Sequence, residues 1–84
     1  MPRALPPDLL DLLRCPETRQ RLRLATAAEL DALNRRVQAG TLANHAGQPR
    51  TTPLEAALIR DDGLRAYPIE GDIPVLLIDE ALSL

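Results

Sequence analysis

The side chains best suited to chemistry in this sequence are one thiol, one imidazole and one adjacent pair of carboxylates: Cys15, His45 and Asp61–Asp62. A cysteine nucleophile needs a neighbouring base and an oxyanion site, and His45 lies in a polar stretch that offers nothing to orient its ring. Consecutive residues at a strand turn point apart, so the two aspartates read as a solvated turn rather than a carboxylate dyad. We therefore expect no catalytic constellation, a buried Cys15 and a His45 that belongs to a loop.

The composition fits one small domain and excludes several classes of function. The chain has 84 residues, one cysteine and a formal net charge of -2. All ten basic residues are arginines scattered among twelve carboxylates, and Tyr67 is the single aromatic residue, so neither a basic patch nor a set of stacking rings suits nucleic acid. No apolar run approaches the ~20 residues that span a bilayer. We expect one cytoplasmic domain over residues 1–84 that binds neither nucleic acid nor membrane.

The first half of the chain predicts two helices separated by a strand. Asp8 can cap a short helix whose leucines follow at helical spacing and which ends near Cys15–Pro16. The alternation Arg-Leu-Arg-Leu over residues 21–24 predicts a half-buried strand. Thr26-Ala-Ala-Glu29 is a capping box, and apolar residues follow at helical spacing as far as Gly40, which predicts a second helix. Residues 41–53 are rich in turn-forming types and predict a loop or an irregular hairpin.

The second half predicts a small antiparallel meander. Residues 54–60 and 64–69 flank a tight turn at Asp61-Asp62-Gly63, and residues 74–78 form a third apolar strand. Pro68 and Pro74 cannot donate ladder hydrogen bonds, so they belong at a sheet edge or at a strand start. The apolar run 75–78 either has both faces covered or leaves one face for a partner. The fold class is α+β, with an antiparallel sheet of three to four strands, a short N-terminal helix and an inserted helix.

Three segments, taken in order, resemble the YcaR-like family. They are residues 9–16 (Leu-Leu-Asp-Leu-Leu-Arg-Cys-Pro), a strand that ends in Leu22, and residues 66–77 (Ala-Tyr-Pro-Ile-Glu-Gly-Asp-Ile-Pro-Val-Leu-Leu). This family comprises small bacterial proteins similar to the zinc-binding activator subunit that, in eukaryotes and archaea, binds and stabilises methyltransferases acting on tRNA, rRNA and release factor. The resemblance implies a zinc-ribbon-like sheet, in which residues 26–53 form an inserted helix and loop.

The resemblance also implies four zinc-ligand positions, of which one still carries a ligand. The family's Cys-Pro-x-Cys start is Cys15-Pro-Glu-Thr18 here, and counting back from Tyr67 places Arg60 and Gly63 at the other two positions. An arginine repels a metal cation, and the neighbouring aspartates and the histidine match no usual substitute site. We therefore expect no zinc and no other cofactor, with the turn held by apolar packing and by hydrogen bonds from Thr18 and the turn backbone.

The function that the resemblance implies is a non-catalytic module that docks on a class I methyltransferase and stabilises it. Docking would extend the partner's sheet through an edge strand, with apolar side chains supplying specificity. The residues expected at this surface are Tyr67, Ile69, Ile73, Pro74, Val75, Leu76, Leu77 and Ile78. Core packing is the alternative role for Tyr67. The alternative function is a structural domain without a methyltransferase partner, whose apolar strand pairs with its own copy in a homodimer.

Overall fold

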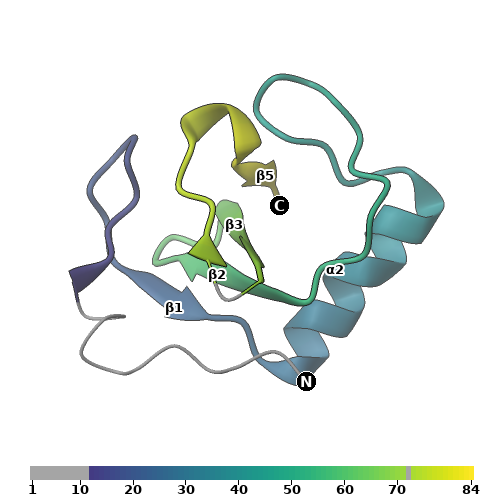
Figure 1. Cartoon of the computed structure of the whole chain (residues 1–84), viewed down its shortest axis with the longest axis horizontal. Coiled ribbons are helices and arrows are strands. Elements are labelled where there is room, and N and C mark those ends of the chain that lie inside the picture. The colour runs from purple at the N-terminus through teal and green to yellow at the C-terminus, as the bar shows by residue number, and fades with distance from the viewer. Residues whose placement is uncertain (1–11, 72) are drawn as a thin grey trace.

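The protein is α+β: one helix lies beside a strongly curled antiparallel sheet that forms half of a barrel (Figure 1). The computed structural model describes residues 12–71 and 73–84. The elements in chain order are strand β1 (Leu22–Leu24), helix α2 (Ala27–Ala39), strands β2 (Ala56–Arg60), β3 (Arg65–Glu70) and β4 (Ile73–Pro74), the 3-10 turn η1 (Ile78–Glu80) and strand β5 (Leu82–Ser83).

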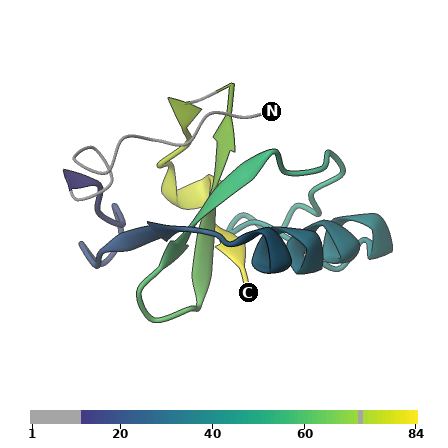
Figure 2. The same ribbon diagram turned by 90° about the horizontal axis from the view of Figure 1, so that it is seen from below.

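The sheet has the order β1-β2-β3-β4, and every pair in it is antiparallel. Leu22 lies opposite Arg60, and Leu58 lies opposite Tyr67. The β2–β3 hairpin closes at Gly63, which takes the positive φ of 73° that favours glycine. Figure 2 shows how far the sheet twists, because β1 and β3 run in clearly different directions. The predicted strand at residues 21–24 and the predicted hairpin are confirmed.

Helix α2 begins and ends where its sequence signals predict. The Thr26 hydroxyl accepts the backbone N–H of Glu29 at 3.2 Å, and the Glu29 carboxylate accepts the backbone N–H of Thr26 at 3.0 Å. This capping box satisfies two N–H groups that have no partner inside the helix. Gly40 ends the helix with a φ of 73°. The buried face of α2 presents Leu33 and Val37 to the sheet.

Both faces of the sheet are covered, so the core has two parts. Successive residues of a strand point to opposite faces, and in β2 Ala57 and Ile59 join the part under α2 while Leu58 joins the part inside the curl. The part under α2 consists of Leu33, Val37, Leu42, Leu54, Ala57, Ile59, Ala66 and Leu82. The part inside the curl consists of Cys15, Leu22, Leu58, Tyr67, Ile69 and Ala81. This arrangement explains why β2 and β3 are apolar almost without interruption.

Strand β3 pairs with a different short strand at each end of its outer edge. β5 pairs with Arg65 and Ala66, whereas β4 pairs with Ile69 and Glu70. Pro68 falls between the two pairings, where its missing N–H breaks no ladder bond, and its carbonyl accepts the N–H of Val75 at 2.9 Å. A proline is thus accommodated inside the sheet because the ladder is already interrupted there.

The prediction of a third apolar strand over residues 74–78 is wrong. Strand pairing ends at Pro74, and the chain then leaves β3, turns through η1 and returns as β5. A longer β4 would need the edge of β3 at Ala66 and Arg65, which β5 already occupies. The predicted N-terminal helix begins on residues outside the described ones; its described part ends at Leu12, earlier than the predicted end near Cys15–Pro16, and Arg14 forms an antiparallel bridge with Arg21. Within the described residues, no helix is long and apolar enough to cross a membrane.

Candidate functional site

A buried cluster of charged and polar groups joins the turn that follows Cys15 to the β2–β3 hairpin. The turn is closed by its own backbone, because the Arg19 N–H donates to the Cys15 carbonyl at 2.7 Å and the Cys15 N–H donates to the Gln20 carbonyl at 2.8 Å. Cys15 is fully buried, and its Sγ lies 2.9 Å from the hydroxyl of Tyr67 in β3. The turn therefore places a thiol against the inner face of the sheet.

The cation of this cluster is the guanidinium of Arg60, at the end of β2. Its Nε and Nη2 donate to the two carboxylate oxygens of Asp62, at 2.9 and 2.8 Å. Its Nη1 lies 3.7 Å from the Sγ of Cys15 and 3.6 Å from a carboxylate oxygen of Glu17. The Arg60 side chain is only 6% exposed. A buried guanidinium is stable only when its donors have partners, and here one thiol and two carboxylates supply them.

The cluster favours the ionised form of its thiol. Burial raises the pKa of Cys15, but hydrogen bonds involving Tyr67, Thr18 and Arg60 outweigh burial and lower this pKa to about 6. Burial and the neighbouring sulfur raise the pKa of Tyr67, so its phenol keeps its proton and can donate it to the thiolate. The bidentate contact with Arg60 lowers the pKa of Asp62. Cationic guanidinium and anionic partners thus stabilise one another.

The positions that the resemblance assigns to zinc ligands are brought together in part. Cys15 and Arg60 are in contact, and hydrogen bonding to Thr18 contributes to the lowered pKa of the thiol. Gly63 has no side chain to contribute and serves instead to close the hairpin. The described residues contain no group of three or more histidine, cysteine or acidic side chains arranged to hold a metal ion. Arg60 therefore supplies positive charge between the two turns.

The remaining side chains considered for chemistry do not assemble into a site. Cys15 is fully buried, so a substrate has no access to its sulfur. His45 is exposed in the loop after α2, as predicted. Asp62 is exposed in the hairpin turn, as predicted, and it also pairs with Arg60 and accepts the backbone N–H of Leu64 at 2.9 Å. The cluster is thus built to hold two turns together.

A second feature is the exposed apolar segment from Ile73 to Ile78, which we call the apolar edge. Ile73 is 67% exposed, Leu77 61% and Ile78 40%, although each is a large apolar side chain. Pro74, Val75 and Leu76 lie between them and are half-buried. Three exposed branched side chains within six residues exceed the scatter of single apolar residues that is usual on a protein surface. The apolar edge is therefore the best candidate for a binding surface.

The backbone of the apolar edge is also available for pairing. Leu77 has extended backbone angles, with φ of -103° and ψ of 132°. Within the described part of the chain, neither Leu76 nor Leu77 donates its backbone N–H to another group. An extended segment with unpaired N–H groups at the rim of a sheet can accept an added strand.

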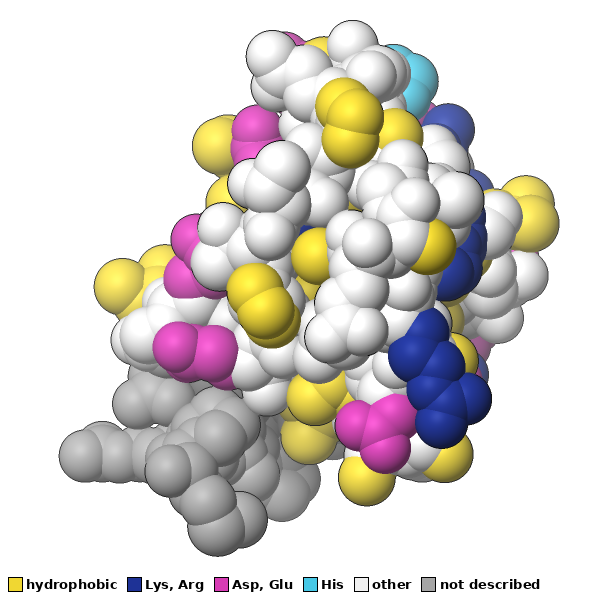
Figure 3. All heavy atoms as spheres, turned by 90° about the vertical axis from the view of Figure 1, so that its right-hand side faces the viewer, with side chains coloured by type: hydrophobic (Ala, Val, Ile, Leu, Met, Phe, Trp, Pro, Cys, Tyr) yellow, Lys and Arg dark blue, Asp and Glu magenta, His cyan; other side chains and the backbone are white. Residues whose placement is uncertain are grey.

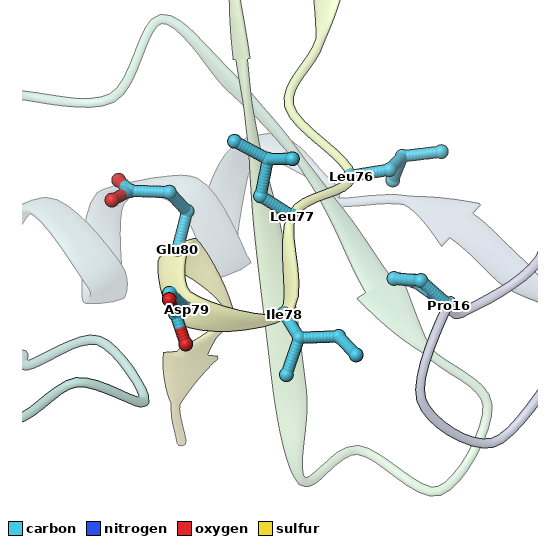
Figure 4. A pocket seen from close by; sticks show the side chains of 6 residues that line it. All are labelled: Pro16, Leu76, Leu77, Ile78, Asp79 and Glu80. Carbon is cyan, nitrogen blue, oxygen red and sulfur yellow. The ribbon is translucent and has the colours of Figure 1, made fainter.

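An open groove runs along the apolar edge. It has a volume of about 480 Å³ and is lined by Pro16, Leu76, Leu77, Ile78, Asp79 and Glu80. Figure 4 shows Pro16 and Leu76 toward one end of the groove, Asp79 and Glu80 toward the other, and Leu77 and Ile78 between them. The groove therefore combines an apolar end with an acidic end.

Two residues predicted at the binding surface are not part of it. Tyr67 is fully buried and Ile69 is 2% exposed, so both belong to the core inside the curl. Neither side chain leaves surface that a partner could contact. The sequence prediction also missed Pro16 and the two acidic residues of the groove. The alternative of core packing is the correct one for Tyr67.

The face that carries helix α2 differs from the apolar edge. On this face, which Figure 3 shows, apolar side chains stand singly among charged and other polar groups and do not gather into one patch. The charged groups of this part of the chain include the ion pair between Arg23 and Glu29, whose closest N–O distance is 2.6 Å. This ion pair also flanks β1, where charge discourages pairing with another strand.

Comparison with solved structures finds a protein of the same fold. The solution NMR structure of XF2673 from Xylella fastidiosa matches with a TM-score of 0.75 and 41% sequence identity, over 90% of this chain and 78% of that protein. No protein-family model matches the chain, and no curated protein matches it. The likeness extends through sequence as well as fold, and the name of that protein states no activity.

Proposed function

The chain belongs to the same family as XF2673 from Xylella fastidiosa, and on this shared fold we propose that it is a non-catalytic module that docks on a larger protein through its apolar edge. The observation that carries the proposal is the exposure of Ile73, Leu77 and Ile78 on one short segment, which is extended as far as Leu77 and turns at Ile78. Neighbouring N–H groups of an extended segment point to opposite sides, so a partner strand laid along this segment would pair with one of the unpaired N–H groups of Leu76 and Leu77 while it covers apolar side chains of the same segment.

The energy available from this contact suits a specific complex. Burial of a large aliphatic side chain stabilises by about 1.5–3 kcal/mol, and each of Ile73, Leu77 and Ile78 has between 40% and 67% of its surface left to bury. Together they would contribute roughly 2.5–5 kcal/mol, to which main-chain hydrogen bonds and the groove would add. Removal of one of these side chains should therefore weaken the complex measurably. The exposed apolar surface is also small enough for the chain to exist without its partner.

The partner that we propose is a class I methyltransferase. Support comes from the resemblance of residues 9–16 and 66–77 to the YcaR-like family, whose relatives in eukaryotes and archaea stabilise methyltransferases. The role of the chain is then stabilisation by mass action, because a protein that binds only the folded partner shifts the partner's folding equilibrium. The methyltransferase keeps all the catalytic residues, in agreement with a chain whose thiol is buried and bonded.

The test is an affinity purification from the source organism with three forms of the tagged full chain. The first is the wild type, the second is Ile73→Ser/Leu77→Ser, and the third is the control Leu64→Ser. Leu64 is 59% exposed and lies at the β2–β3 hairpin, so its replacement matches that of Leu77 in type and exposure at a different site. Circular dichroism of each form checks that the fold is kept.

We expect the wild type and Leu64→Ser to recover a methyltransferase in stoichiometric amount and Ile73→Ser/Leu77→Ser to lose it. Recovery of the same partner by all three forms would move the docking surface away from the apolar edge. Recovery of the bait alone, as a discrete dimer that the double variant dissociates, would replace the proposal by the self-associating structural domain.

A further inference from the structure

The two acidic residues of the groove lack the arginine partner that four other described carboxylates have. Glu17, Glu29, Asp62 and Glu70 each pair with an arginine of the described chain. Asp79 and Glu80 line the groove, and neither forms an ion pair with a described residue. No arginine lines the groove with them. One end of the groove therefore carries two negative charges that no described residue neutralises.

These carboxylates lie on the same short stretch as the apolar side chains. Leu77 and Ile78 immediately precede Asp79 and Glu80 in the chain, and all four residues line the groove. A segment of a partner protein that covers Leu77 and Ile78 therefore also lies close to Asp79 and Glu80. An apolar side chain at the acidic end would desolvate carboxylates without a partner, and an acidic side chain would be repelled. A basic side chain would instead pair with them at the rim of the contact, where water still screens the charges.

We propose that the groove binds an extended segment of the partner protein in which an arginine or lysine stands beside alternating apolar residues. The apolar residues cover Leu76, Leu77 and Ile78, and the basic side chain reaches Asp79 and Glu80. This inference rests on the proposed function, and it adds the chemistry of the segment that the apolar edge recognises. Charge complementarity selects this occupant over an acidic or purely apolar segment.

The test uses three short peptides and the full chain labelled with 15N. The peptides are acetylated, amidated and identical except at their ends: Arg-Val-Leu-Val-Arg, Gln-Val-Leu-Val-Gln and Glu-Val-Leu-Val-Glu. The variable residue stands at both ends, so either direction of binding presents it to the carboxylates. Amide shifts in 15N–1H correlation spectra locate each peptide and give its affinity, at low and at high salt.

We expect the arginine peptide to shift the amides of residues 76–80 and to bind at least about fivefold more tightly than the glutamate peptide. High salt and the variant Asp79→Asn/Glu80→Gln should each bring this ratio toward one, while Leu77→Ser should weaken all three peptides. The amide variant removes charge and keeps shape, so the fold is not at risk.

Any of three peptide results would overturn the inference: equal affinities for the three peptides, a preference that survives Asp79→Asn/Glu80→Gln, or no binding of any peptide. Equal affinities that are all lost in Leu77→Ser would leave docking at the apolar edge intact, so this failure is distinct from failure of the proposed function. Sedimentation of the free chain completes the test. A dimer that dissociates in Asp79→Asn/Glu80→Gln would make a second copy the occupant and would also overturn the inference.

Discussion

Replacement of Arg60 by methionine is expected to destabilise the fold strongly. Methionine keeps an unbranched side chain of similar length and removes the charge, so the change isolates the guanidinium from the space that it fills. In the wild type this group is 6% exposed and holds Asp62 with two bonds of 2.8 and 2.9 Å. The variant Arg60→Met leaves Asp62, Glu17 and the thiol of Cys15 facing one another without a cation.

The expected loss follows from how far each partner is buried. Breaking a fully buried ion pair costs about 3–5 kcal/mol, since a charge is left without a counter-charge in a poorly solvated place. The side chains of Glu17 and Asp62 are 36% and 26% exposed, so water recovers part of this energy. We therefore expect the free energy of unfolding to fall by about 2–4 kcal/mol, against a total of roughly 4–13 kcal/mol for a chain of this length.

Urea unfolding followed by circular dichroism measures this loss, and thermal unfolding should show Tm lower by at least about 10 °C. The matched control is Arg23→Met. Arg23 also makes a bidentate contact with a carboxylate, that of Glu29, but its side chain is 52% exposed. The control should lose less than about 1 kcal/mol. The double-mutant cycle of Arg60→Met with Asp62→Asn should give a coupling energy of about 1 kcal/mol or more.

The reasoning would be refuted if Arg60→Met and Arg23→Met lost the same small amount of stability. That result would mean that the buried cluster contributes no more than a surface ion pair. Additive losses in the double-mutant cycle would likewise show that Arg60 and Asp62 do not stabilise each other.

Three further predictions concern the thiol, the helix cap and the core. The pKa of Cys15 is about 6 in the folded chain, whereas an unfolded thiol has a pKa of about 8.5. The free energy of unfolding should therefore rise as the pH increases from 6 to about 8.5, and this stabilisation should be lost as the pH falls through 6. Urea unfolding at several pH values should show this dependence in the wild type but not in Cys15→Ser. Thr26→Ala should cost about 1 kcal/mol by loss of the capping box, whereas Thr51→Ala, in an exposed loop, should stay within about 0.5 kcal/mol. Leu58→Ala should cost about 2–5 kcal/mol because Leu58 is fully buried, and Leu64→Ala should be nearly neutral; equal losses would contradict the assigned core.

Local signals in the sequence predicted the elements that depend on local interactions. The capping box at Thr26–Glu29 and the stop at Gly40 fix α2, because each acts through hydrogen bonds within a few residues. Gly63 fixes the β2–β3 hairpin in the same way. Burial of Cys15 was predicted as well, from the absence of any group that could make it reactive.

Elements that depend on distant residues were not predictable from one sequence. The apolar run 74–78 has the composition of a strand, but β5 competes for the same edge of β3 and leaves β4 with two residues. Packing of the whole sheet decides which of the two apolar segments pairs with this edge of β3. A local sequence pattern carries no information about that packing.

The candidate site was predictable only in part for the same reason. The resemblance placed Arg60 with Cys15 among the positions of one former metal site, but the sequence prediction treated Arg60 only as a residue that excludes a metal ion. The direct contact between the guanidinium and the thiol, 45 positions apart in the chain, comes from the structure. The prediction of a binding surface at residues 73–78 stays a prediction, with Tyr67 and Ile69 removed from it because they are buried.

The central proposal is that the chain docks through its apolar edge, and hydrogen–deuterium exchange tests it most directly. The full chain is compared alone and in complex with the recovered methyltransferase. In the free chain the amides of Leu76 and Leu77 should exchange quickly, since they donate to no described group. In the complex, whichever of the two amides faces the partner strand should become strongly protected, while those of α2 remain unchanged. Protection confined to α2 or to β1, with residues 76 and 77 still exchanging quickly, would contradict the proposal.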